Sequence, residues 1–136
     1  MLLTNYALLA FPVREVQVVS YEEQETAICF VIKVHLNDGG GNFLLVRRRY
    51  STFHKLKTTV DTLPVRIDAT FPAKTFVRMT RARPLLQRLA ALDQWLGAVV
   101  SACNENFVGP NVPRYIVDLR AHTLAFLALC SPRFEV

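Results

Sequence analysis

Cysteine is scarce in this 136-residue sequence, and no stretch is apolar enough to cross a membrane. The three cysteines, Cys29, Cys103 and Cys130, are odd in number and form no C-x-x-C pair. They predict reduced, mostly buried thiols in a cytosolic protein rather than a disulfide framework. No apolar run approaches the ~18 residues of a transmembrane helix, so we expect any membrane contact to be peripheral. The apolar N-terminus, residues 1–13, lacks the basic region and cleavage site of a signal peptide, which favours a first strand.

Catalytic motifs are also missing. The sequence has no H-E-x-x-H and no G-x-S-x-G, and the glycines at 39–41 lack the Lys-Ser/Thr of a phosphate-binding loop. His35, His54 and His122 are isolated, so each is predicted to be a surface or half-buried residue and not a ligand or base. We therefore expect no enzymatic activity, no bound metal and no cofactor.

Basic residues are abundant and concentrated in the middle of the chain. Between Arg47 and Arg88, eleven basic residues and two acidic ones give +9, which leaves −4 for the remainder of a chain whose total is +5. Such asymmetry predicts a polyanionic partner, either an anionic lipid surface or nucleic acid. A solvated basic face with no partner is the alternative.

The apolar pattern predicts strands first and helices afterwards. β-branched and alternating residues indicate strands over 13–20, 26–36 and 42–49, with turns over 22–25 and 37–42. Helical spacing then indicates three helices, the last in one or two pieces. The first follows Ser51 as its N-cap and ends near Leu63, the second begins at Pro84 and ends near Cys103, and the third covers 113–129.

These elements predict an α+β fold in a single domain over residues 1–136. We expect a three-stranded antiparallel β-meander packed against a helical subdomain of three to four helices. Residues 65–83 show no clear period and form a long loop that contains Pro72. Loops of this length in a compact domain are usually functional or disordered.

The stretch VRRRYSTFHKL, residues 46–56, places three arginines at a strand end. Alternation puts Arg47 and Arg49 on one face of the strand and Arg48 on the other, so Arg47 is placed to assist Arg49 and Arg48 is expected to be solvated. Arg49 precedes Tyr50 and the helix start, whose amides add positive potential. A guanidinium beside an aromatic ring suits an anionic ring compound. A solvated strand end is the alternative.

RRRYSTFHKL resembles the R-R/K-Y/F-S-x-F-x-x-L signature of PX (phox homology) domains, which are phosphoinositide-binding modules. The resemblance extends over nearly the whole chain, because a long proline-containing loop and a helix with R-x-x-x-L-x-x-W/F-L follow the signature. It implies the same meander packed on a helical subdomain.

The resemblance also implies roles for four residues. Arg49 corresponds to the arginine that holds the 3-phosphate of phosphatidylinositol 3-phosphate, and Tyr50 to the aromatic residue under the inositol ring. Lys74, in FPAKTF, corresponds to the lysine that contacts the 1-phosphate. Arg88 corresponds to the arginine that contacts the 4- and 5-hydroxyls, and helical geometry places it beside the buried stripe of its helix.

The loop after Pro72 is expected to contact the membrane, as the corresponding loop does in the family. Apolar side chains would enter the interface while basic ones meet anionic headgroups. The alternative is that Phe76 and Val77 cap the core. Phe71 replaces a proline that is common in the family, and Thr52 stands where an acid is common. The residues expected at the membrane are Phe76, Val77, Arg78, Met79 and Arg81.

The resemblance implies a cytoplasmic module that is peripheral on endosomal membranes and monomeric as an isolated domain. Its partners would be a phosphoinositide headgroup, most simply phosphatidylinositol 3-phosphate, and an anionic membrane surface. One alternative is a protein-interaction scaffold with weak lipid affinity, whose partner would use the proline loop. Nucleic-acid binding is not expected, because stacking needs exposed rings and the strands offer only Phe30 and Phe43, both predicted to lie in the core.

Overall fold

The computed structural model describes residues 11–25, 27–37, 39–75, 81–105 and 111–128. The strand predicted for the first residues of the chain, Cys130 and the tip of the proline loop therefore lie outside the described residues. Within the described ranges, no helix is long and apolar enough to cross a bilayer.

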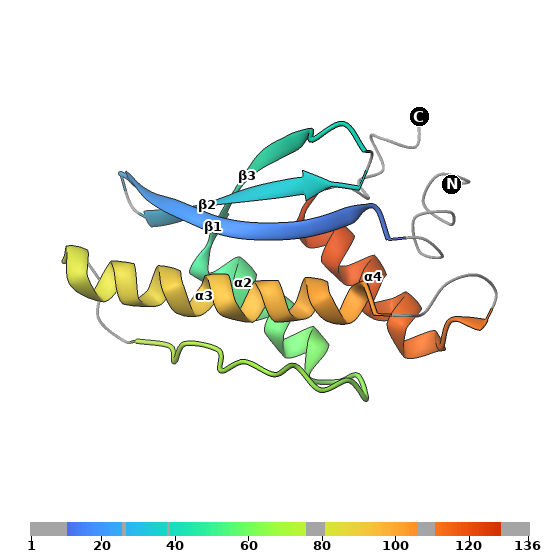
Figure 1. Ribbon diagram of the computed structural model, residues 1–136. Helices are drawn as coiled ribbons and strands as arrows, with labels where there is room; N and C mark the ends of the chain where they lie inside the picture. Colours follow the sequence, from blue (N-terminus) through green and yellow to red (C-terminus); the bar gives the residue numbers. More distant parts are fainter. Residues whose placement is uncertain (1–10, 26, 38, 76–80, 106–110, 129–136) are drawn as a thin grey trace.

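Three antiparallel strands form one sheet in the order β1-β2-β3 (Figure 1). They are β1 (Val13–Gln24), β2 (Ala27–Leu36) and β3 (Phe43–Arg49). The predicted meander and α+β class are confirmed. The turn predicted over 22–25 is wrong, because Glu22–Gln24 continue β1 and pair with Ala27–Cys29 of β2. Pairing with β2 satisfies the backbone hydrogen-bonding groups of these residues, while their polar side chains lie largely in solvent. Polar side chains alone therefore did not end the strand.

The β2–β3 turn uses glycine where the backbone requires it. Gly39 and Gly41 have φ of +76° and +71°, values that glycine adopts without strain. The amide of Leu36 donates to the carbonyl of Asn42 at 3.0 Å and closes the hairpin.

The described helices are α2 (Tyr50–Val60), α3 (Ala82–Cys103) and α4 (Arg114–Phe126). Each begins or ends within a few residues of its predicted bound. The predicted N-cap at Ser51 is wrong, because α2 begins one residue earlier. Arg49 occupies the N-cap in an extended conformation (φ −82°, ψ 161°) and makes no side-chain capping bond.

The core lies between the inner face of the sheet and the helices. The alternating face of β2 supplies Phe30, Ile32 and Val34, each at most 1% exposed. The stripes of α2 and α3 face them. These stripes comprise Phe53, Leu56 and Val60 on α2, and Leu92, Trp95, Leu96 and Val99 on α3.

The described part of the long loop has neither helix nor strand, as predicted, yet it is ordered by packing. In Figure 1 the chain between α2 and residue 75 runs along α3 on the side away from the sheet. Every second residue is half-buried against the core: Leu63, Val65, Ile67, Ala69 and Phe71. This period of two is a signal in the sequence that the prediction of no clear period missed.

Helix α3 covers the free edge of β1 (Figure 1). The β1 register shifts between Val18 and Ser20, and the Val18 amide donates to the Asp93 carboxylate at 2.7 Å. The Asn104 side-chain amide donates to the Val13 carbonyl at 2.8 Å. Side chains of α3 and its C-cap thus satisfy edge groups that would otherwise be open for pairing with another chain.

Phe43 corrects a second expectation about the sheet. Phe30 is buried, but Phe43 is 48% exposed, and the ammonium of Lys33 lies 4.3 Å from its ring centroid. Leu44 and Leu45 are exposed as well, at 40% and 49%.

Removing the Asp93 carboxylate should destabilise the fold. Asp93→Ala leaves the Val18 amide without its partner, and we expect the free energy of unfolding to fall by about 1–3 kcal/mol. Denaturant unfolding measures the loss. Asp68→Ala is the matched control, because Asp68 is exposed on the loop, and it should change stability by less than about 0.5 kcal/mol. Equal effects of the two substitutions would contradict the role of Asp93.

Candidate functional site

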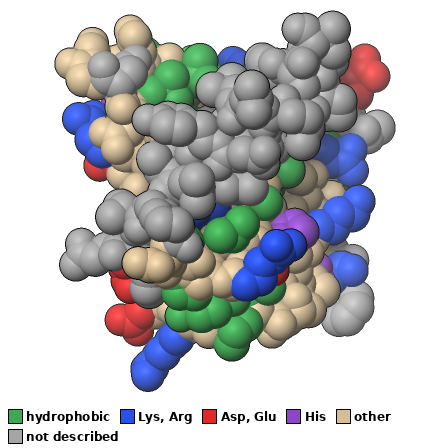
Figure 2. Space-filling view, turned by 90° about the vertical axis from the view of Figure 1, so that its right-hand side faces the viewer, with side chains coloured by type: hydrophobic (Ala, Val, Ile, Leu, Met, Phe, Trp, Pro, Cys, Tyr) green, Lys and Arg blue, Asp and Glu red, His purple; other side chains and the backbone are tan. Residues whose placement is uncertain are grey.

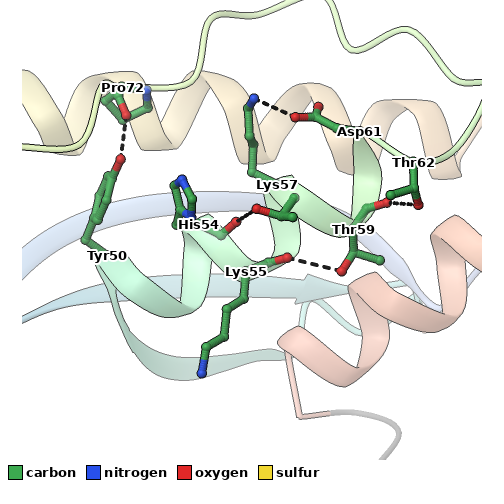
Figure 3. Close-up of polar contacts among 9 residues, drawn as sticks. Tyr50, His54, Lys55, Lys57, Thr59, Asp61, Thr62 and Pro72 are labelled. Atoms are coloured by element: carbon green, nitrogen blue, oxygen red, sulfur yellow. Dashed lines mark hydrogen bonds and ion pairs between the residues drawn. The ribbon is translucent and has the colours of Figure 1, made fainter.

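Tyr50 is the residue at which the parts of the candidate site meet. It is the first residue of α2, and its half-buried side chain points toward the loop (Figure 3). The Tyr50 hydroxyl donates to the carbonyl of Pro72 at 2.8 Å. Burial raises the pKa of the Tyr50 phenol, and the nearby Arg88 and Lys57 charges oppose that rise. The phenol is therefore neutral at physiological pH and tethers the loop to the start of α2.

Arg88 of α3 joins the same group from the other side of the loop. Its guanidinium carbon lies 4.0 Å from the Tyr50 ring centroid, which is a cation–π contact. Its Nη2 donates to the Ala73 carbonyl at 2.9 Å and to the Thr75 hydroxyl at 3.4 Å. Partial burial lowers the pKa of Arg88. Because the ordinary pKa of an arginine is very high, the guanidinium stays charged.

Lys74 lies between the two loop residues that Arg88 contacts. It is exposed, and it lines an open pocket of about 220 Å³ together with Tyr50, Ser51, His54 and Lys55. Two lysines and a hydroxyl line this pocket beside an aromatic ring. Its lining residues include no acid, so it presents positive charge to solvent.

Arg49 stands at the start of α2 with its side chain exposed. Among the described residues it has no hydrogen bond or ion pair, and no contact joins it to Lys74 or Arg88. The N-terminus of α2 has no side-chain cap and no acid in its first turn. The unpaired amides of α2 and the free guanidinium of Arg49 can therefore both donate hydrogen bonds to an anion.

The other two arginines of the run have partners elsewhere. Arg48 points toward the helices, as alternation predicted, but it is not merely solvated. Its Nε donates to the Phe126 carbonyl at 2.8 Å at the end of α4, and burial lowers its pKa. Arg47 lies on the same face as Arg49, but its guanidinium is paired with Glu22 of β1.

Phe71 is part of the site, although in the sequence it stands out only as a departure from the family pattern. Its ring centroid lies 5.6 Å from that of Tyr50, 4.9 Å from that of Trp95 and 6.0 Å from that of His54. It thus supports the Tyr50 ring from the loop. The signal that could have found it is its place as the last apolar residue of the alternating segment.

The predicted membrane loop is described only at its ends. Phe76, Val77, Arg78 and Met79 lie outside the described residues. Arg81 is exposed at the N-cap of α3, with φ of −85°.

Figure 2 shows the face on the right-hand side of Figure 1, where described Lys and Arg side chains lie among hydrophobic, acidic and backbone surface. Among the described residues, no group of His, Cys, Asp and Glu is arranged to hold a metal ion. Cys29 and Cys103 are free and buried, and burial raises the Cys103 pKa to about 12, so that thiol is inert.

The family model of the PX domain matches residues 40–104. That span contains β3, α2, the loop and α3, and therefore all four predicted headgroup residues. Over these residues the chain is similar to a PX domain. The resemblance seen in RRRYSTFHKL is thus confirmed, and PX domains are a family of phosphoinositide-binding modules.

The fold of this chain is also found in a solved structure. The crystal structure of the mouse SNX19 PX domain with bound sulphate ion matches with a TM-score of 0.54 at 16% sequence identity. The match covers 87% of this chain and 97% of the mouse domain. No protein among the curated sequences matches.

The raised pKa of Tyr50 predicts a pH dependence that Tyr50→Phe should remove. A phenol whose pKa is higher in the fold than its unfolded value of about 10 contributes stability below that pH and loses it as pH rises through the folded pKa. Tyr50→Phe also loses the bond to Pro72, so at pH 8 we expect it to be less stable by about 1 kcal/mol. Urea unfolding from pH 8 to 11 should show that the difference in the free energy of unfolding between the unchanged chain and Tyr50→Phe narrows above pH 10. A difference that stays constant or widens would refute the raised pKa of Tyr50.

Proposed function

We propose that this chain is a PX domain that binds phosphatidylinositol 3-phosphate and holds its protein on endosomal membranes as a peripheral, non-enzymatic module. The carrying observation is the convergence of three segments on Tyr50: the start of α2, the loop at 72–75, and Arg88 of α3. Arg88 stacks on the Tyr50 ring, Lys74 lines a pocket with Tyr50, and Arg49 directly precedes Tyr50 in the chain.

Each of the four residues has a role in this proposal. Arg49, unpaired at the uncapped start of α2, takes the 3-phosphate in a bidentate contact. Tyr50 supplies the ring face for the inositol, and Lys74 takes the 1-phosphate that leads to the lipid tails. Arg88 donates to ring hydroxyls, and for this it exchanges part of its present contact with Ala73.

The rest of the basic segment adds affinity without reading the headgroup. The loop residues Phe76, Val77, Arg78, Met79 and Arg81 would enter or meet the interface, and each basic residue there contributes about 1 kcal/mol near an anionic surface. A pocket and a membrane-contacting loop on one domain act together as two linked sites. We further propose that residues 1–136 form one domain that is monomeric in isolation and cytoplasmic.

The bound ion of the mouse relative supports an anion site. The SNX19 PX domain is solved with a sulphate ion. Sulphate and phosphate are both tetrahedral oxyanions, so a relative with this fold holds an anion of the expected class.

Arg49→Ala should abolish most of the binding to phosphatidylinositol 3-phosphate. Loss of a bidentate arginine–phosphate contact predicts at least about a tenfold weaker affinity, because such contacts contribute about 1.5–3 kcal/mol. The measurement is sedimentation with phosphatidylcholine vesicles that contain phosphatidylinositol 3-phosphate. Vesicles matched in charge with phosphatidylserine should bind far less.

Arg114→Ala is the matched control. Arg114 is an exposed arginine of α4 whose partner is Asp118, so the variant has the same charge as Arg49→Ala but an intact site. It should bind within about twofold of the unchanged chain. Circular dichroism should show both variants folded. Equal binding by Arg49→Ala and Arg114→Ala would reject the pocket and favour a protein-interaction scaffold.

A further inference from the structure

The outer face of the sheet, away from the helices, carries a row of residues that includes Arg49. In the strand register, Glu22 of β1 lies opposite Cys29 of β2, and Cys29 lies opposite Arg49 of β3. Arg47 lies opposite Val31, two residues further from the helix start. Glu22, Arg47 and Arg49 therefore share one face and one end of the sheet.

Glu22 holds Arg47 with both carboxylate oxygens. Arg47 Nε donates to one oxygen at 2.9 Å, and its Nη2 donates to the other at 3.4 Å. This contact joins β1 to β3 and must cross the central strand β2, because Cys29 and Val31 lie between them. The carboxylate raises the pKa of Arg47 through the hydrogen bond and its charge.

The two β2 residues under this crossing are unusually protected. Cys29 is 7% and Val31 is 4% exposed, although both lie on the face that none of the described helices covers. An ion pair that lies across apolar side chains shields them from water and is itself held in place, because moving the guanidinium would expose the strand beneath.

We infer that Glu22 is a specificity-determining residue of the phosphoinositide site, because it withholds Arg47 from the headgroup. With Arg48 bound to the Phe126 carbonyl, Arg49 is the one arginine of the run without a partner among the described residues. One available guanidinium suits a headgroup with a single phosphate at this edge. This inference rests on the proposed function of the same site.

Arg47 lies close enough to Arg49 to contribute to the same site if its ion pair with Glu22 is broken. It lies two residues from Arg49 on the same face, about 7 Å along the strand. The Arg47 and Glu22 side chains are 47% and 43% exposed, so their pair is a surface ion pair of modest strength. Releasing Arg47 should therefore add a few-fold in affinity for a headgroup with a second phosphate.

The test compares Glu22→Gln with Glu23→Gln. Both variants remove one negative charge from the same strand. Glu23 is exposed, lies opposite Ile28 on the other face, and has no ion pair among the described residues. Affinity is measured with phosphatidylcholine vesicles that contain phosphatidylinositol 3-phosphate, its 3,4-bisphosphate or its 3,5-bisphosphate, with phosphatidylserine added to equalise total charge.

We expect Glu22→Gln to raise the affinity for at least one bisphosphate by about three- to fivefold, beyond any change in Glu23→Gln. The affinity for phosphatidylinositol 3-phosphate should change much less. Adding Arg47→Ala to Glu22→Gln should abolish the gain. Circular dichroism shows that each variant is folded.

Two results would overturn the inference alone: identical behaviour of Glu22→Gln and Glu23→Gln while the unchanged chain binds phosphatidylinositol 3-phosphate, or a gain that survives Arg47→Ala. If the unchanged chain binds none of the phosphoinositide vesicles above the phosphatidylserine control, the proposed function fails together with this inference.

Discussion

The stacking of the Arg88 guanidinium on the Tyr50 ring, 4.0 Å from its centroid, joins the two halves of the candidate site. Tyr50 directly follows the last residue of β3, and Arg88 is a residue of α3. The loop is held from both sides, since Tyr50 donates to Pro72 and Arg88 donates to Ala73. Lys74 follows directly, so its position depends on these bonds. If the stack is lost, the sheet, the loop and α3 are still folded, but their charged groups no longer share one ring.

The three consecutive arginines show why net charge alone does not define a binding site. Arg47 is paired with Glu22 across the sheet, and Arg48 is bonded to a carbonyl at the end of α4. Each of these contacts stabilises the fold and takes charge away from a ligand. Arg49 differs because it ends the strand and is the N-cap of the helix, where no described residue offers its side chain a partner. Whether an arginine of this run is available to a ligand therefore depends on its position in the fold and not on its residue type.

The period of the apolar residues was enough to predict the meander and the three described helices, because strands and helices bury faces of fixed spacing. The stripe of α3 and the alternation in β2 are examples. The sequence did not indicate contacts between distant residues: Val18 with Asp93, Arg48 with Phe126, or Phe71 with Trp95. Those contacts depend on how the elements pack, which no local pattern encodes. Local polarity also misled at Glu22–Gln24, where strand pairing outweighed the turn preference of the side chains.

The position of the headgroup-binding site is tested most directly by an NMR titration of the chain with a soluble, short-chain phosphatidylinositol 3-phosphate. We predict saturable shifts that are largest at the Tyr50 ring, the Arg49 and Arg88 side chains and Lys74, with little change at Lys33 or Arg114. The strongest shifts at another surface, such as the groove between α2 and α4 that Thr59, His122 and Ala125 line, would contradict the proposed site. So would small shifts spread over all basic residues without saturation.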